Sequence, residues 1–177
     1  MIKESKPKTT RKSNSKYEKL ISKIEPLLEA NEVALVYSKL PNEVSQIGSS
    51  RDVSMLLWPY FEHLCELKEQ MVAITLNRIN QVLGITRMSS GSRTGTVLDI
   101  SHLCAVAFLQ NASAVIIAHN HPSGNLRPSD ADVTLTKKVK SALKLHDIDL
   151  HDHLIMAGSQ GLLSSPSYYS FADEGLI

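Results

Sequence analysis

Residues 114–132 read AVIIAHNHPSGNLRPSDAD, and this stretch decides how the chain folds. Its first five residues, 114–118, are wholly apolar, which is typical of a strand that is buried on both faces. Pro122 and Gly124 then break the strand and turn the chain. Ser129, directly after a second proline, is a favourable N-cap for a helix. The stretch therefore predicts a central strand, a tight loop and a helix, in that order.

The polar residues of this stretch have the spacing of metal ligands. His119 and His121 are two residues apart, so both imidazoles project from one face if the strand continues through them. Asp132 lies in the first turn of the expected helix, and the two elements can bring all three side chains to one point. Three protein ligands with a fourth position for water are the arrangement of a catalytic zinc site. Two histidines and one carboxylate also describe a facial-triad iron site, so both metals stay open.

Each of these residues also has a simpler interpretation. A lone histidine is usually a surface or hydrogen-bonded group, and Ser129 with Asp132 forms a capping box at the helix start. The two roles are compatible, because a serine hydroxyl at a helix start can also help to hold an oxyanion. His151 and His153 are two apart on another expected strand and form a rival metal pair. We favour one of them supporting the site indirectly, by orienting a ligand.

The rest of the chain predicts helices mixed with hairpins and central strands, which gives an α/β or α+β layered domain. Hydrophobic periodicity and cap residues indicate where these elements lie. We expect helices over Tyr17–Ala30, from a Ser50 cap with Pro59 inside it, from an Asp99 cap to about Gln110, and from Ser129 to near His146; we expect strands over Glu32–Ser38, Gln70–Leu76, Gln81–Thr86, Ala114–Ala118 and Ile148–Met156.

Length and composition exclude several classes of protein. The 177 residues are 42% hydrophobic and 21% charged, which excludes collagen-like, mucin-like and fully disordered chains. The two cysteines, Cys65 and Cys104, form no C-x-x-C pair, so a disulfide scaffold and a thioredoxin-like redox pair are excluded. The most apolar stretch, Leu103–Ala118, is interrupted by polar residues and is too short to span a membrane. No signal-peptide pattern opens the chain, so we expect a soluble cytoplasmic protein.

The formal net charge of +1 hides an uneven distribution. Residues 1–19 carry a balance of +5, whereas the remaining chain carries −4. Residues 1–16 are rich in Lys, Ser and Thr, so we interpret them as a disordered basic arm. Such an arm could make weak contact with DNA, although a solubilising tail is the favoured interpretation. The acidic balance of the remainder argues against nucleic acid as the substrate of the metal site itself.

The central motif resembles that of a known family. The pattern H-x-H-P-x(6)-S-x-x-D, formed by His119, His121, Pro122, Ser129 and Asp132, resembles the JAMM motif of the JAB1/MPN metalloproteases. The fuller string HNHPSG, with Asp152-His153 further along, closely resembles the RadC-like branch, over about residues 50–177. The resemblance implies a curved mixed sheet flanked by helices. It also implies one zinc ion per chain, held by the two histidines, the aspartate and water, with Ser129 near the reacting carbonyl.

The resemblance also implies a glutamate general base on a separate upstream strand. Glu69, directly before QMVAITL, fits the family pattern best, and Glu66 and Glu62 are the fallbacks. Without the resemblance, Glu69 would be interpreted as a solvated charge at the end of a helix. Asn120 departs from the Ser or Thr that eukaryotic members have between the two histidines, but the RadC-like branch accepts Asn.

These observations define three segments: a disordered basic arm (1–16), an N-terminal helix and short strand (17–49), and a RadC-like JAB/MPN domain (50–177). The expected function is that of a zinc metallohydrolase that cleaves an amide bond in a peptide or another amide-containing substrate. Asp152 and His153 are candidates to support the metal ligands. The alternative is a nucleic-acid-associated accessory protein with a structural or idle metal site. Here the DNA-repair label of the family rests on its name only.

Overall fold

The computed structural model describes residues 46–61, 67–90, 98–157 and 166–177. The described residues belong to one compact unit. The expected arm (1–16), the helix over Tyr17–Ala30 and the strand over Glu32–Ser38 lie outside them. In the part of the chain that is described, no helix combines the length and apolar character needed to cross a membrane.

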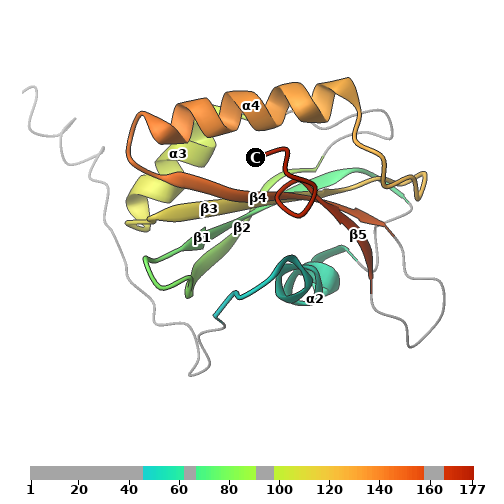
Figure 1. Cartoon of the computed structure of the whole chain (residues 1–177), viewed down its shortest axis with the longest axis horizontal. Coiled ribbons are helices and arrows are strands. Elements are labelled where there is room, and N and C mark those ends of the chain that lie inside the picture. The colour runs from blue at the N-terminus through green and yellow to red at the C-terminus, as the bar shows by residue number, and fades with distance from the viewer. Residues whose placement is uncertain (1–45, 62–66, 91–97, 158–165) are drawn as a thin grey trace, which may run out of the picture. The chain divides into compact units, whose positions relative to one another are not determined.

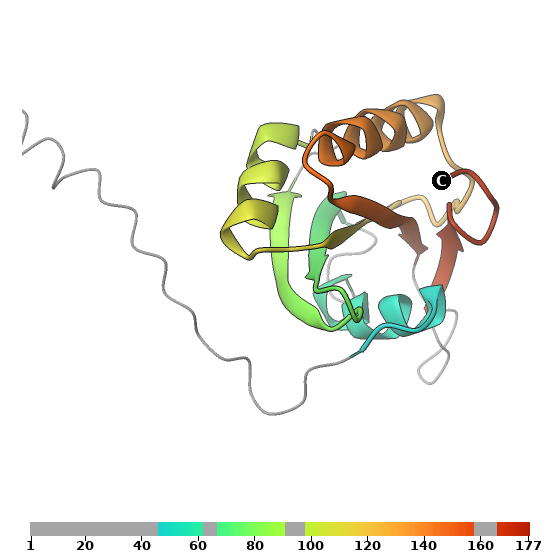
Figure 2. The same ribbon diagram turned by 60° about the vertical axis from the view of Figure 1, so that its left-hand side comes forward.

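A five-stranded mixed sheet forms the middle layer of the fold, with the order β2-β1-β3-β4-β5. β3 and β4 pair in parallel, and every other neighbouring pair is antiparallel. Helices α3 and α4 cover one face and α2 covers the other (Figure 1). Figure 2 shows β1 and β2 bending around α2. The bounds of the elements are α2 Ser50–Phe61, β1 Gln70–Leu76, β2 Val82–Ser90, α3 Ile100–Leu109, β3 Ala114–Asn120, α4 Asp130–Lys144, β4 Asp149–Ala157 and β5 Ser167–Ser170.

The prediction of a curved mixed sheet flanked by helices is confirmed. β3 is the central strand, and all seven of its residues are buried, as its apolar composition predicts. It also runs two residues further than predicted, through His119 and Asn120. The helix from Ser129 is confirmed as well, because α4 begins directly after that residue and connects β3 to its parallel neighbour β4.

Strand alternation divides the core into two clusters. Val115 and Ile117 of β3 pack in the cluster that includes residues of α3 and α4, whereas Ile116 and Ala118 pack in the cluster that includes residues of α2. Because side chains alternate along a strand, His119 belongs to the α3/α4 side of the sheet and Asn120 to the α2 side. This alternation decides which polar side chains at the end of β3 can meet.

The helix ends follow local capping chemistry. Asp99 caps α3 as predicted, because its carboxylate accepts the backbone N–H of Ser101 at 2.9 Å. The Ser50 cap is wrong by one residue: the hydroxyl of Ser49 accepts the backbone N–H of Asp52 at 3.2 Å, and Ser50 is the first residue of α2. Pro59 lies inside α2 without ending it.

The predicted hairpin is confirmed with a longer second strand. β1 has its predicted bounds, but β2 continues to Ser90, four residues beyond the predicted end. Gln81 makes only an isolated bridge to Gln46, so it precedes β2 rather than belonging to it. Positive φ at Asn80 (59°) closes the turn. At the other edge of the sheet, β5 is a short strand that the sequence pattern did not predict.

Candidate metal centre

Three predicted ligands meet where β3 ends and α4 begins. The Nε2 atoms of His119 and His121 are 3.0 Å apart, and Asp132 Oδ1 lies 3.2 Å from His119 Nε2. Asp132 Oδ2 lies 3.6 Å from His121 Nε2. Metal–nitrogen bonds of about 2.0–2.1 Å in tetrahedral geometry place two ligand atoms about 3.3 Å apart. The three side chains therefore fit around one ion, and this group could hold a metal.

A chain of hydrogen bonds orients His119. The Thr136 hydroxyl donates to the backbone carbonyl of Asp132 at 2.7 Å, so its oxygen accepts the Nδ1–H of His153, also at 2.7 Å. His153 Nε2 is then an acceptor, and it receives the Nδ1–H of His119 at 2.9 Å. These hydrogen bonds leave the Nε2 lone pair of His119 directed at His121 and Asp132. Both His119 and His153 are 0% exposed, so this tautomer is held in the core.

The loop after β3 orients His121 in the same way. The carbonyl of Asn125 lies 2.6 Å from His121 Nδ1, and a carbonyl can only accept, so Nδ1 carries the proton. The Nε2 lone pair of His121 therefore also faces the group. Gly124 makes this loop possible, because its φ of 75° lies in the left-handed region that favours glycine. Its N–H also donates to the carbonyl of His121 at 3.0 Å.

A capping box fixes Asp132. The backbone N–H and the hydroxyl of Ser129 donate to Asp132 Oδ2 at 2.7 and 2.6 Å, while Ser129 Oγ accepts the backbone N–H of Asp132. This arrangement uses Oδ2 and leaves Oδ1 facing His119. The capping role of Ser129 is thus seen directly. Ser129 is also an exposed residue.

In the metal-free chain, the close approach of these side chains shifts the pKa values of Asp132, His121 and His153. Burial alone would raise the pKa of Asp132, but in the metal-free chain protons taken up on Nε2 of His119 and His121, together with the Ser129 hydroxyl, hydrogen-bond to the carboxylate and hold its pKa well below the usual range. The Asp132 carboxylate raises the pKa of His121. Burial lowers the pKa of His153 to about 3, so this imidazole stays neutral at ordinary pH. A cation would replace the proton that the carboxylate otherwise attracts.

Glu69 directly precedes β1, the strand that pairs with β3. β1 pairs with β3 so that Met71 is opposite His119, and Glu69 lies two residues before Met71. The charge of Glu69 is near enough to contribute to the raised pKa of His121. The fallbacks, Glu66 and Glu62, lie outside the described residues.

His153 and Asp152 differ in where they point. His153 contacts His119, as described above, so it is placed to support a ligand. The Asp152 carboxylate instead accepts hydrogen bonds from the hydroxyl of Ser170 (2.6 Å) and the backbone of Ala172 (3.0 Å). Consecutive residues on a strand face opposite sides, so Asp152 anchors the C-terminal strand β5 and its following turn. Burial raises the pKa of this carboxyl.

His151 and His153 do not form the rival metal pair. The register between β3 and β4 shifts by one residue at this point, since Leu150 is opposite Val115 but Asp152 is opposite Ile116. His151 is exposed and lies 3.1 Å from the side-chain oxygen of Asn80, whereas His153 is buried. A β-bulge of this kind separates two side chains that simple alternation would place on one face.

Two supporting residues were missed as functional candidates. Thr136 follows Asp132 by four residues, so helical spacing could have indicated that both face the same point. Asn120 was noted only as a departure from a family pattern. It is buried, and its amide binds backbone groups of Lys68 and Gln70, about 50 residues earlier in the chain. No local signal in the sequence predicts that contact.

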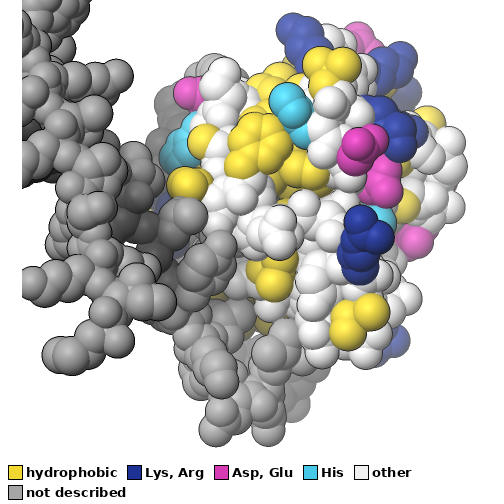
Figure 3. All heavy atoms as spheres, turned by 90° about the vertical axis from the view of Figure 1, so that its left-hand side faces the viewer, with side chains coloured by type: hydrophobic (Ala, Val, Ile, Leu, Met, Phe, Trp, Pro, Cys, Tyr) yellow, Lys and Arg dark blue, Asp and Glu magenta, His cyan; other side chains and the backbone are white. Residues whose placement is uncertain are grey.

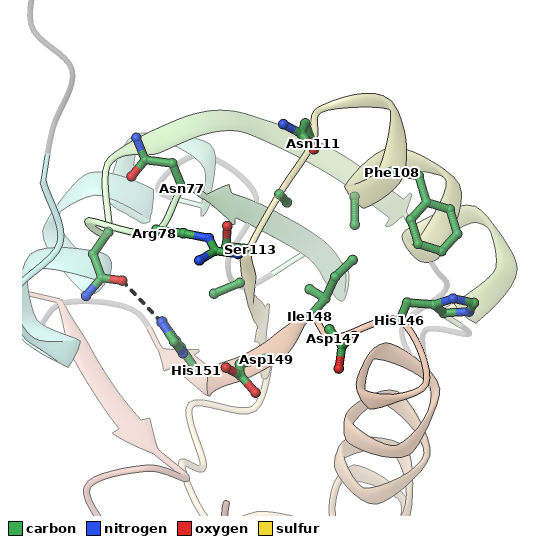
Figure 4. Close-up of a pocket in the computed structure, with 14 residues that line it drawn as sticks. Asn77, Arg78, Phe108, Asn111, Ser113, His146, Asp147, Ile148, Asp149 and His151 are labelled. Carbon is green, nitrogen blue, oxygen red and sulfur yellow. Dashed lines mark hydrogen bonds between the residues drawn. The ribbon is translucent and has the colours of Figure 1, made fainter.

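A separate groove lies at the opposite end of the sheet, with a volume of about 780 Å³ (Figure 4). It is lined by the β1–β2 turn and by the loops that precede β3 and β4, and the residues labelled there include Arg78, Phe108, His146 and His151. Figure 3 shows apolar side chains beside a histidine on one face of the molecule. Phe108 at the end of α3 is 48% exposed, and its ring makes an edge contact with His146. Of the candidate site residues, only His151 of the rival pair lines this groove.

The fold and the ligand group define a class: a layered α/β domain with a possible two-histidine, one-carboxylate metal site. A family model described as the RadC-like JAB domain matches residues 47–176. The chain therefore belongs to the RadC-like JAB domain family, as the sequence resemblance implied.

Curated relatives agree with this assignment. The chain is 34% identical to a UPF0758 protein of Flavobacterium johnsoniae over 76% of its length, and 37% identical to one of Porphyromonas gingivalis over 74%. This chain is also 40% identical to the UPF0758 protein YfjY of Escherichia coli. That match covers 62% of this chain and 64% of the relative. The chain spans about half the length of the first two relatives (55% and 54%). None of these three names states an activity.

Proposed function

We propose that this chain is a zinc-dependent hydrolase that cleaves an amide bond, with His119, His121 and Asp132 as the zinc ligands. The observation that carries the proposal is the direction of the ligand atoms. Hydrogen bonds to His153 and Asn125 leave both Nε2 atoms facing the Asp132 carboxylate: His119 Nε2 lies 3.2 Å from its Oδ1 and His121 Nε2 lies 3.6 Å from its Oδ2. When no proton occupies these two nitrogens, they and the carboxylate are acceptors that converge on one point, which is the arrangement that binds an ion.

Zinc at such a site supplies a Lewis acid and lowers the pKa of a bound water to about 7. The residues of the chain supply the rest of the mechanism. Glu69, directly before β1 and near enough to His121 to affect its pKa, takes a proton from the attacking water and passes it to the leaving amine. His153 keeps His119 in the tautomer that a ligand needs.

Ser129 is proposed to donate a hydrogen bond to the oxygen that becomes negative as the carbonyl is attacked. In the described arrangement its proton is directed at Asp132 Oδ2. A hydroxyl rotates freely about its C–O bond, so it can turn from the carboxylate to a substrate oxygen at the same exposed position. The capping bond from the Asp132 backbone can persist during this turn, because it uses the oxygen of Ser129 as acceptor.

The reaction is tested with zinc-loaded full-length protein and a pool of peptides of mixed sequence, read out by mass spectrometry. We expect cleavage products that are absent with Glu69→Gln, whose zinc content should equal that of the wild type. The loss should be about 10²–10⁴-fold, the usual contribution of general acid–base catalysis. Equal cleavage by Glu69→Gln would contradict the role of Glu69. An intact pool with fully zinc-loaded wild type would reject peptides as the substrate class.

The choice of zinc over iron is tested by metal analysis of protein purified under nitrogen. We expect about one zinc per chain in four-coordinate geometry. One iron(II) per chain in six-coordinate geometry would instead support the facial-triad alternative.

A second function, weak DNA binding in the cytoplasm, is proposed on the charge of residues 1–19, which carry a balance of +5. Removing residues 1–16 should weaken binding to duplex DNA and reduce its dependence on salt concentration. Binding of the intact chain that does not change between about 50 and 200 mM salt would contradict this proposal.

A further inference from the structure

We propose that Asn120 is a positioning residue that fixes the backbone on both sides of Glu69. Its side-chain oxygen accepts the backbone N–H of Gln70 at 2.8 Å, and its side-chain N–H donates to the backbone carbonyl of Lys68 at 2.9 Å. Lys68 and Gln70 are the two neighbours of Glu69 in the chain. One side chain therefore holds the segment that carries the proposed general base, and the inference rests on that proposed role of Glu69.

The contact continues the sheet where its backbone pairing stops. The register of β1 with β3 ends at Met71 opposite His119, so the next rung would join Gln70 and Asn120. There the amide of Asn120 replaces a main-chain partner for the Gln70 N–H. A primary amide is the side-chain group that can both donate and accept in this way without carrying charge. Asn120 is 0% exposed, so water does not compete with these bonds.

Asn120 acts through the backbone and does not extend into the metal centre. Alternation along β3 places its side chain on the α2 side of the sheet, whereas the side chain of His119 belongs to the α3/α4 side. It also lies in sequence directly between the two candidate histidine ligands. Asn120 thus connects the end of β3, beside His119, to the segment before β1 that carries Glu69. We infer that it sets the distance between the ion and the Glu69 carboxylate.

The first test measures the contact itself by hydrogen exchange of backbone amides in the full-length chain. In Asn120→Ala, exchange of the Gln70 amide should accelerate about 10-fold or more, because its buried acceptor is removed. The matched control is Thr75→Val, which removes a hydroxyl from a buried residue elsewhere on β1. This hydroxyl lies against the side-chain oxygen of Gln110 and the Gly84 carbonyl of β2. We expect this control to leave Gln70 exchange within about twofold of wild type. Unchanged Gln70 exchange in Asn120→Ala would overturn the proposal.

The second test asks whether the contact matters to Glu69. Co²⁺ is bound to the full-length chain, and the pH at which its visible absorption changes is measured. Glu69→Gln should shift this midpoint, on the order of one pH unit, because a charge next to the ion is removed. Asn120→Ala should shift it in the same direction, and the double variant should shift no further than Glu69→Gln alone. Thr75→Val should leave it unchanged.

The outcomes separate this inference from the proposed function. A midpoint that moves in Glu69→Gln but not in Asn120→Ala would overturn the positioning role and leave the general base intact. A midpoint that moves in neither variant, or a wild type that binds no Co²⁺, would overturn both. If Asn120→Ala does not fold, Asn120→Ser replaces it. The shorter serine side chain cannot reach both backbone groups, so the same shifts are expected.

Discussion

The two ends of the β-sheet carry similar residues in different arrangements. At one end His119, His153 and Asp132 are buried, at 0%, 0% and 8% exposure. At the other end His146, His151, Asp147 and Asp149 are exposed around the open groove (Figure 4). The exposed groups make separate pairs with unrelated partners: His151 with Asn80, Asp149 with Lys144, and His146 with the Phe108 ring. Only the buried end brings its donor atoms to one point among the described residues.

The difference shows that orientation, and not residue type, makes a candidate metal site. At the buried end each histidine has one nitrogen occupied by a fixed partner, His153 or Asn125, so the other nitrogen has a defined direction. An exposed imidazole rotates and exchanges its partners with water, and an ion gains little from it.

The largest expected effect is on zinc affinity. Structural zinc sites bind with about 10–16 kcal/mol over four ligands, so two lost ligands should cost about 6 kcal/mol, or about 10⁴-fold in affinity. We expect this loss in the double variant His119→Ala, His121→Ala, measured by competition with a chelator. The matched double variant His146→Ala, His151→Ala should bind as the wild type does. Equal loss at both ends would remove the distinction between them.

A smaller effect is expected on turnover from Ser129→Ala. Loss of one oxyanion donor typically lowers the rate by about 10²–10³-fold. Loss of the helix cap should cost about 1 kcal/mol of stability, which leaves the chain folded. Peptide cleavage by the zinc-loaded variant, with a urea titration beside it, checks both numbers. Wild-type turnover with a lowered urea midpoint would mean that Ser129 serves only as a cap.

A moderate effect is expected from the residue behind His119. Removing a partner that orients a ligand typically lowers metal affinity by about 10–100-fold. His153→Gln should show this loss, and His151→Gln, two residues away on the same strand, should not. Chelator competition measures both variants under identical conditions. An affinity change in His151→Gln of equal size would contradict the assignment of His153 as the supporting residue.

The smallest effect concerns the stability of the metal-free chain. His153 has a pKa of about 3 when folded and about 6.5 when unfolded, so the unfolded state binds more protons between these values. Stability should therefore fall as the pH drops below about 6.5, by up to about 1.4 kcal/mol per pH unit. Urea titrations in EDTA from pH 6.5 to 4.5 check this, and His153→Gln should flatten the slope.

His121 acts in the opposite direction in a different pH range. The Asp132 carboxylate raises its pKa, so its contribution is complete below the unfolded pKa of about 6.5 and is lost as the pH rises through the folded pKa. Asp132 has a lowered pKa, so its contribution is present above about pH 4 and is lost only in more acidic solution. Between pH 4.5 and 6.5 the contributions of His121 and Asp132 to the free energy of unfolding change little with pH. The pH dependence measured in this range therefore comes mainly from His153.

The sequence predicts the part of the site that is local in the chain. His119, His121 and Asp132 span 14 residues of one strand–loop–helix unit, and the turn and cap residues between them determine their approach. The capping box at Ser129 follows from the same few residues. Such short-range relations need no knowledge of how distant strands pair.

The parts that the sequence could not predict depend on register between distant segments. The hydrogen bonds from Asn120 to the backbone of Lys68 and Gln70 require that β1 lie antiparallel to β3 with Met71 opposite His119. The separation of His151 from His153 requires a bulge whose position depends on pairing with β3. Glu69 was identified through a family pattern, because an isolated acidic residue before a strand has no distinguishing signal of its own.

The most direct test of the ligand set is anomalous X-ray diffraction at the zinc absorption edge, from crystals of the whole 177-residue chain grown with zinc. We expect one peak about 2.0–2.2 Å from His119 Nε2, His121 Nε2 and an oxygen of Asp132. We also expect the Glu69 carboxylate within hydrogen-bond reach of the fourth coordination position. A peak at the groove beside His146 and His151, or no peak between the three proposed ligands, would show that His119, His121 and Asp132 are not the zinc site.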